Sequence, residues 1–133
     1  MYSVTIQIHF CYGHRLLHYE GKCRHLHGHN ARADITLTGP ALDSRGMLYD
    51  FVEIKHLIKD WIDETIDHTM LLNQADPVLD CLKQGGERVH GMEDNPTAEN
   101  IARMIYGFVH KQGYPVHDVA VWETETSCAR YAP

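Results

Sequence analysis

The sequence predicts a single α+β domain, residues 1–133, in which two helices cover one face of a four-stranded antiparallel sheet in the order ββααββ. Three observations lead to this prediction. Apolar and polar residues alternate near both ends of the chain, as is typical of half-buried strands. Two segments in the middle repeat apolar residues at helical spacing. With 133 residues and 44% hydrophobic content, the chain suits one compact core and is too short for two ordinary domains.

The first two strands are predicted to form an antiparallel pair. Residues 4–10 alternate apolar and polar side chains, and this strand ends near Gly13. Residues 31–38 repeat the pattern until Gly39-Pro40 ends the strand. The connection between them, residues 13–29, is long and rich in histidine, which indicates a functional loop.

Start and stop signals place the two helices. Asp50 begins the first as a cap, with Glu53 three residues later in a capping-box pattern, and the helix runs to about Thr65. Asn95-Pro96 begins the second as an Asn cap with proline at the first helical position, and this helix ends near Gly113.

The remaining segments complete the predicted order. Residues 72–94 contain one proline and three glycines and indicate a long connection, with at most one short helix around 78–83. Residues 119–122 alternate as a strand, and residues 127–131 can pair with them as a closing hairpin.

Composition excludes several functional classes. The net charge of −6 gives no general basic field, which argues against nucleic acid or an anionic membrane as the main partner. No apolar run approaches the roughly 20 residues of a membrane span, and the start lacks a secretory pattern, so we expect a cytoplasmic protein. No C-x-x-C pair is present, so the thiols are expected to be reduced: Cys11, Cys23, Cys81 and Cys128.

Histidine is unusually abundant, and its spacing indicates a metal site. The chain has 11, of which six lie in the first thirty positions: His9, His14, His18, His25, His27 and His29. Residues two apart in an extended chain project from one face, so His27 and His29 can clamp one ion. By the same parity, His14 and this pair point toward the apolar side of the predicted sheet. Three imidazoles around Zn²⁺ leave a fourth position open, as in catalytic sites.

Spacing alone leaves alternatives for these histidines. His25 continues the same alternation and His18 lies nearby, so either can be the third ligand in place of His14. The pair His27 and His29 can also be core histidines that bond to backbone carbonyls.

Four short motifs resemble the 6-pyruvoyl/6-carboxy-tetrahydropterin synthase family. Cys23–Asn30 reads C-x-x-x-H-G-H-N and follows His14-Arg15-Leu16, which resembles the signature of the carboxy-tetrahydropterin branch in the queuosine pathway. Asp67-His68, Pro96–Asn100 and Trp122-Glu123-Thr124 follow in family order. The resemblance covers essentially the whole chain. It implies that zinc is bound by His14, His27 and His29 and that Cys23 is a catalytic thiol. It further implies that Asp67 and His68 handle protons and that Glu123 anchors the pterin.

The resemblance also implies fold and assembly. The family has the tunnelling fold (T-fold), in which four-stranded sheets of neighbouring subunits join into a barrel with active sites at the interfaces. A homo-oligomer, a hexamer or a tetramer, follows by analogy. Three departures from the family pattern put substrate-tail contacts in question: Ala98 replaces a hydroxyl residue, Cys11 stands where small or aromatic residues are usual, and residues 72–94 are longer than in compact members.

Several implied roles have structural alternatives. Glu123 can bind the pterin's parallel N–H donors or pair with Arg130. Asp67-His68 can relay protons or be an ordinary helix-terminal pair. Thr97 and Glu99 can contact the pterin or only cap the second helix. The candidate cations for a triphosphate, which can equally be solvated surface groups, are Arg15, Lys22 and Arg24.

The expected function is that of a zinc-dependent lyase acting on a pterin triphosphate. It would convert 7,8-dihydroneopterin triphosphate to 6-carboxy-5,6,7,8-tetrahydropterin with release of acetaldehyde and triphosphate. An alternative is a 6-pyruvoyl-tetrahydropterin synthase, which only eliminates triphosphate. An alternative of another class is a non-catalytic zinc-binding subunit, in which the histidines only stabilise the fold.

Overall fold

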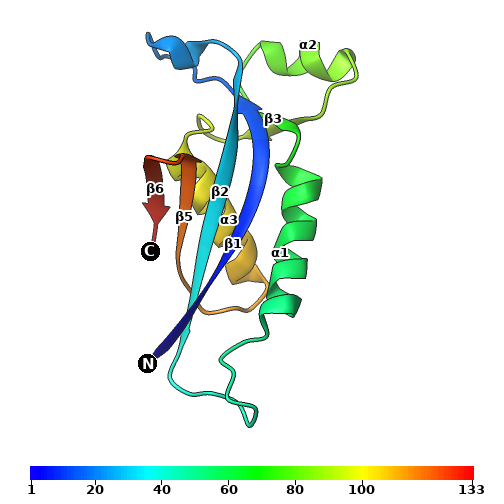
Figure 1. Ribbon diagram of the computed structural model, residues 1–133. Helices are drawn as coiled ribbons and strands as arrows, with labels where there is room; N and C mark the ends of the chain where they lie inside the picture. The colour runs from blue at the N-terminus through cyan, green and yellow to red at the C-terminus, as the bar shows by residue number, and fades with distance from the viewer.

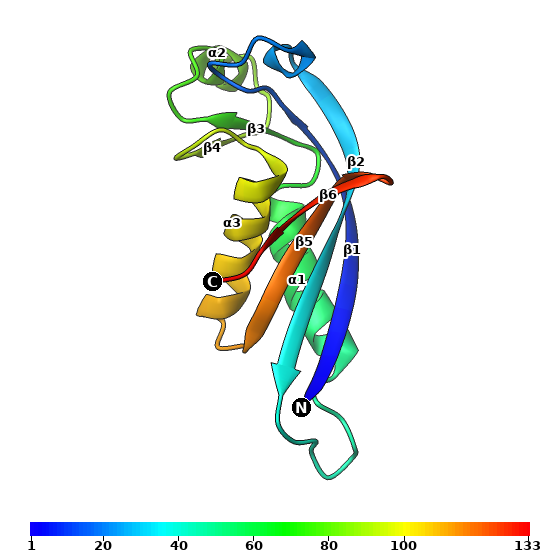
Figure 2. The same cartoon turned by 90° about the vertical axis from the view of Figure 1, so that its left-hand side faces the viewer.

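The protein has one mixed sheet with its two long helices on one face. A computed structural model describes all residues, 1–133. Figure 1 and Figure 2 show α1 and α3 lying on the same side of the curved sheet. The sheet has six strands in the order β4-β3-β1-β2-β5-β6. The α+β class and the helix placement are therefore confirmed.

The centre of the sheet is a long hairpin. Strand β1 (Tyr2–His14) pairs antiparallel with β2 (His27–Gly39) over 13 residues, from Tyr2↔Gly39 to His14↔His27, without a register shift. Alternate residues of both strands are buried against the helices, as the period-2 pattern predicts. The ladder brings the last residue of β1 opposite the first of β2. The intervening loop contains a 3₁₀ turn, η1 (Lys22–Arg24).

The predicted antiparallel ladder continues on the β2 side. Strand β5 (Val116–Thr124) pairs with β2, and β6 (Ser127–Tyr131) pairs with β5. The four predicted strands therefore form one antiparallel array.

The predicted order is incomplete on the β1 side. Strand β3 (Thr69–Asn73) pairs parallel with β1, and β4 (Val89–Met92) pairs parallel with β3. Helix α2 (Val78–Gln84) connects them and matches the expected short helix. Residues 72–94 are thus a strand–helix–strand crossover rather than an irregular connection. Strands of four or five residues depend on pairing with a neighbour, so their own pattern is weak.

The two long helices begin at side-chain caps. Helix α1 (Phe51–Thr65) starts at Asp50, whose carboxylate accepts a hydrogen bond from the Val52 N–H at 2.9 Å. Helix α3 (Ala98–Lys111) starts at Thr97, whose hydroxyl accepts from the Asn100 N–H at 3.2 Å. The prediction that Asn95 caps this helix is wrong. Both helices bury isoleucine-rich faces in one hydrophobic cluster with the sheet.

No helix of the structure combines the length and apolar character that a bilayer crossing requires.

Candidate metal centre and proton-handling pair

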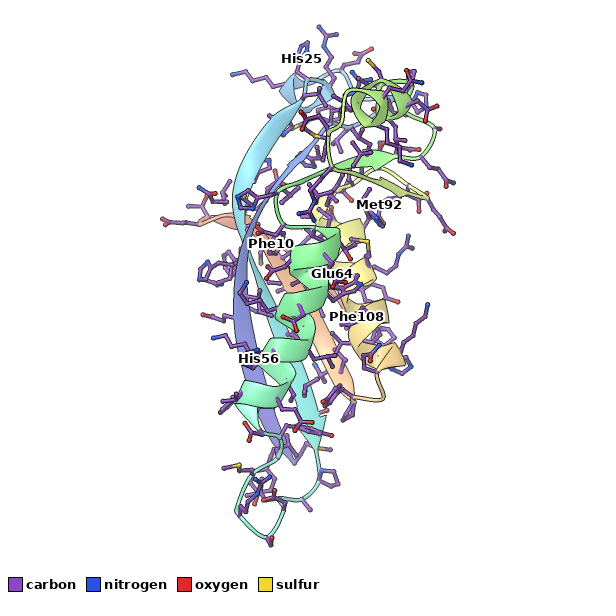
Figure 3. The ribbon with its side chains drawn as sticks, turned by 90° about the vertical axis from the view of Figure 1, so that its right-hand side faces the viewer. Phe10, His25, His56, Glu64, Met92 and Phe108 are labelled. Carbon is purple, nitrogen blue, oxygen red and sulfur yellow. The ribbon has the colours of Figure 1, made fainter.

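Three histidines meet where β1 ends and β2 begins. His14 faces His27 in the ladder, and His29 lies opposite Tyr12, so the three imidazoles project on the helix-facing side of the sheet. Their ring centroids are 4.5 to 5.1 Å apart, and one nitrogen of each lies within 4.8 Å of the others. Of the three candidates for the third position, the structure places His14 with the pair. His25 lies in the loop at the upper end of the molecule in Figure 3 and is exposed, as is His18.

Backbone carbonyls fix the orientation of two of these rings. His14 Nδ1–H donates to the Pro96 carbonyl at 2.7 Å, and His27 Nδ1–H donates to the His25 carbonyl at 2.6 Å. A carbonyl only accepts, so Nδ1 carries the hydrogen in both rings and a neutral ring leaves a lone pair on Nε2. Burial lowers the pKa of His14, which keeps this ring neutral. The two Nε2 atoms face each other at 3.0 Å.

This arrangement fits a bound cation. Two lone pairs that face each other repel. His29 Nε2 is buried and makes no hydrogen bond, although Glu123 Oε1 lies 3.0 Å away and adds negative charge beside the rings. A divalent ion of the kind that imidazole prefers would satisfy all three nitrogens. Core histidines bonded to carbonyls explain the two Nδ1 contacts but not the facing lone pairs.

The segment before α3 supports the first of these histidines. The Asn95 side-chain amide donates to the Leu17 carbonyl at 2.8 Å and accepts from the Leu17 N–H at 3.0 Å. It thereby ties the loop after His14 to the segment that carries the Pro96 carbonyl. The sequence signal was the Asn-Pro pair, which also fits a helix cap, so the supporting role was missed.

A second cluster lies on the opposite face of β1. Asp67 and His68 directly precede β3, and His68 Nδ1 lies 2.8 Å from Asp67 Oδ2 and 3.5 Å from Cys11 Sγ. Burial by itself raises the pKa of Asp67, but hydrogen bonds from the Cys11 N–H and from His68, with the charge of His68, outweigh it and lower the pKa. Asp67 is therefore ionised at neutral pH and holds the Nδ1 proton of His68. The Nε2 atom of His68 takes no part in these contacts, and its side chain is 75% exposed.

The catalytic-thiol candidate, Cys23, belongs to neither cluster. Cys23 sits in η1, where its carbonyl accepts from the Leu16 N–H at 2.9 Å. The Tyr12 ring packs against the rings of both His14 and His29, and its hydroxyl is buried without a partner. Burial raises the pKa of Tyr12, and the charges of Glu123 and Cys23 raise it further, so Cys23 is within electrostatic range of Tyr12. Sequence reasoning missed Tyr12, which reads there as an ordinary core residue.

The structure also describes the surroundings of the predicted pterin-contact residues Thr97, Glu99 and Glu123. Thr97 caps α3, and Glu99 is exposed in its first turn. The alternative pairing of Glu123 with Arg130 is wrong, because Arg130 donates to Asp118 instead.

The candidate phosphate cations differ in availability. Arg15 donates to the buried Asp76 at 2.7 Å, so its charge is already paired. Lys22 and Arg24 are exposed in η1. A hollow of about 620 Å³ lies beside the strands that carry both clusters, and its walls include Cys11, His27, His29 and His68.

The fold and the three-histidine cluster define the class as an α+β protein with a candidate metal centre at the joint of a long hairpin. Residues 3–133 match the family model described as 6-pyruvoyl tetrahydropterin synthase, so the chain belongs to this family, whose members are lyase-type enzymes.

Relatives and solved structures agree with this assignment. The 6-carboxy-5,6,7,8-tetrahydropterin synthase of Rickettsia felis is 39% identical over 131 residues, covering 93% of this chain and 95% of that protein. A crystal structure of an uncharacterised protein from Wolinella succinogenes has a TM-score of 0.80 at 26% identity and covers 98% of this chain and 97% of the other. The 6-pyruvoyl tetrahydropterin synthase of Caenorhabditis elegans has a TM-score of 0.71 at 24% identity, with 100% and 97% covered. The predicted family fold is confirmed.

Proposed function

We propose that the protein is a zinc-dependent lyase that converts 7,8-dihydroneopterin triphosphate to 6-carboxy-5,6,7,8-tetrahydropterin, with release of acetaldehyde and triphosphate. The observation that carries the proposal is the meeting of His14, His27 and His29, each of which places one ring nitrogen within 4.8 Å of the others. The family match and the Rickettsia relative support the substrate class and favour the carboxy product. A place in queuosine biosynthesis follows from that product.

The three histidine Nε2 atoms would hold the zinc. When bound, zinc with an open position supplies Lewis acidity, which lowers the pKa of a coordinated hydroxyl and stabilises negative charge on its oxygen. Around this point the chain adds a carboxylate, Glu123, and a buried phenol, Tyr12, whose raised pKa keeps it a hydrogen-bond donor.

Cys23 and the Asp67–His68 pair would move protons. Removal of a carbon-bound proton beside a hydroxyl requires a base, and Cys23 serves only as thiolate, a form that a nearby cation favours. Asp67 fixes the Nδ1 proton of His68, so the exposed Nε2 can exchange a proton with the substrate or with water. The different environments of the two groups support these separate roles: Cys23 lies in the β1–β2 loop, whereas the imidazole of His68 is bound by a carboxylate next to β3.

Glu123 would anchor the pterin. Its side chain is 27% exposed and has no Lys or Arg partner. A carboxylate in this state can accept two parallel N–H bonds from the pterin ring. Thr97 and Glu99 are proposed as further pterin contacts, although Thr97 also caps α3. Of the three phosphate-binding candidates, Lys22 and Arg24 are favoured because Arg15 is engaged by Asp76.

Assembly into a cytoplasmic homo-oligomer with interfacial active sites is part of the proposal. It is supported by the outer edge of β6, which is the last strand of the sheet and pairs with nothing beyond β5 in one chain. Open strand edges are templates for pairing with another chain. Light scattering combined with size-exclusion chromatography would give the subunit number, and a monomer at micromolar concentration would contradict this part.

The test is product identification. Purified protein loaded with one equivalent of zinc is incubated with 7,8-dihydroneopterin triphosphate, and the products are identified by mass spectrometry together with an assay for acetaldehyde. Carboxy-tetrahydropterin with acetaldehyde is the expected result. A pyruvoyl product without acetaldehyde would move the protein to the other branch of the family.

A substitution distinguishes the proposed lyase from the alternative, a non-catalytic zinc-binding subunit. Cys23→Ala protein with full zinc content is expected to lose turnover while the wild type retains it. Unchanged substrate with the zinc-loaded wild type would leave a zinc protein without this activity.

A further inference from the structure

We propose that Cys11, Asp67 and His68 form a second site for a thiophilic divalent ion, zinc in the first instance, separate from the three-histidine centre. The three residues offer one sulfur, one nitrogen and one oxygen within 4.8 Å of one another. Cys11 lies on the face of β1 opposite His14, because the two are an odd number of residues apart in the strand, and Asp67 and His68 directly precede the neighbouring strand β3. Thiolate, imidazole and carboxylate together are ligands that Zn²⁺ accepts.

The cluster is held in place by backbone hydrogen bonds to a single residue. The His68 N–H donates to the Cys11 carbonyl at 2.8 Å, and the Cys11 N–H donates to Asp67 Oδ1 at 2.8 Å. His68 adopts a left-handed backbone conformation with φ of 54°, which costs about 1–2 kcal/mol for a residue with a side chain. The two bonds to Cys11 stabilise this conformation, which keeps the imidazole beside the thiol. A site with fixed ligands loses less entropy when an ion binds.

The distance between the Cys11 sulfur and the His68 Nδ1 nitrogen fits tetrahedral coordination of one zinc ion. Zinc bonds of about 2.3 Å to sulfur and about 2.05 Å to nitrogen, at the tetrahedral angle, place the two ligand atoms about 3.6 Å apart. The separation of Cys11 Sγ and His68 Nδ1 is 3.5 Å. Asp67 Oδ2 lies 2.8 Å from the same nitrogen, so it must move outward by roughly 0.6 Å to become the third ligand. That movement is within the freedom of a partly exposed carboxylate.

Hydrogen-bond balance and access to solvent also favour an ion. One Nδ1 hydrogen cannot satisfy both the carboxylate and the sulfur, whereas an ion binds all three. The hollow of about 620 Å³ that Cys11 and His68 help to line opens the cluster to solvent. The other three cysteines stand in no comparable cluster with imidazole or carboxylate.

Cobalt titration of the metal-free, full-length protein tests the proposal. Co²⁺ bound to thiolate gives a near-ultraviolet sulfur-to-metal charge-transfer band, which a site of three imidazoles does not give. We expect two equivalents to bind per chain and the band to grow with the second. Cys11→Ser should remove the band and weaken the second equivalent by at least about tenfold, since even outer-shell changes reach that size.

Matched variants locate the thiolate. His68→Asn should weaken the second equivalent in the same way, and asparagine tolerates the left-handed backbone, so the fold is kept. Cys81→Ser and Cys128→Ser should leave both equivalents and the band unchanged. Binding of only one equivalent, a band that survives in Cys11→Ser, or a band lost in Cys23→Ser would overturn the proposal.

A kinetic consequence rests on the proposed function. An ion on His68 would remove the proposed proton carrier, so excess zinc should inhibit the wild type but not a Cys11→Ser variant, with unchanged affinity at the three-histidine centre. If the protein lacked the proposed lyase activity, only this measurement of zinc inhibition would be lost. The cobalt spectrum would still decide whether the second site exists.

Discussion

The two faces of β1 carry two clusters that differ in what holds the imidazole. On the helix-facing side, His14 and His27 donate Nδ1–H to backbone carbonyls and leave Nε2 lone pairs in a buried space. On the other side, His68 donates Nδ1–H to an ionised carboxylate and exposes Nε2 to solvent. The buried pair directs its free ring nitrogens at each other inside the protein, whereas the exposed Nε2 of His68 can exchange a proton with solvent. One strand thus contributes to two chemistries, with His14 in one cluster and Cys11 in the other.

The largest effect is expected from removal of a metal-directed imidazole. His27→Ala should lower zinc affinity by more than the roughly 100-fold that loss of an outer-shell partner reaches, and should abolish turnover. Metal content after dialysis and the rate of product formation are the measurements. His25→Ala, which alters a side chain of the exposed loop, is the matched control. Full zinc content in His27→Ala would break the assignment of this face.

The second face is tested by His68→Asn. Loss of one general acid or base should lower kcat by roughly 10²- to 10⁴-fold, while one equivalent of zinc still binds as in the wild type. Steady-state kinetics and metal analysis measure the two effects, with the exposed helix residue His56→Ala as control. Weaker binding of the first equivalent of zinc, at the three histidines, would mean that the two faces are not independent.

A smaller effect is expected from the support of the metal centre. Asn95→Ala removes the bonds that tie Leu17 to the segment carrying the Pro96 carbonyl, so His14 is held less well. Zinc affinity should fall by about 10- to 100-fold, as for other outer-shell partners. Competition with a chromophoric chelator measures the change. The neighbouring exposed Asp94→Ala should leave affinity unaltered, and equal behaviour of the two variants would refute the supporting role.

The smallest effect is the pH dependence of the metal-free fold. Burial lowers the pKa of His14 and of His29, so below about pH 6.5 the unfolded chain binds more protons than the folded chain. The stability that neutral imidazoles contribute is therefore present above about pH 6.5 and is lost as the pH falls toward the lowered values. Urea unfolding of metal-free protein at neutral and mildly acidic pH should show the loss, and His14→Gln should reduce it. An unchanged midpoint in the wild type would contradict the burial effect.

Sequence could predict what depends on local pattern. Alternation placed His14, His27 and His29 on the apolar face, because parity along a strand needs no knowledge of the rest of the fold. The cap at Asp50 was predicted for the same reason, since its partner is two residues away.

Contacts between distant segments could not be predicted from pattern. The pairing of β3 with β1 joins residues 57 positions apart, and the Thr69–Asn73 run reads equally as strand or buried helix. Cys11 meets His68 only because of that pairing. Asn95 bonds Leu17 across 78 positions, and the same Asn-Pro pair also satisfies the rule for a helix start.

The most direct test of the metal centre is X-ray absorption at the zinc edge of protein loaded with one equivalent of zinc. The arrangement of His14, His27 and His29 predicts three imidazole nitrogens at about 2.0–2.1 Å, one oxygen, and no sulfur shell near 2.3 Å. A sulfur shell, or fewer than three imidazoles, would contradict the assignment of the first ion to this face of β1.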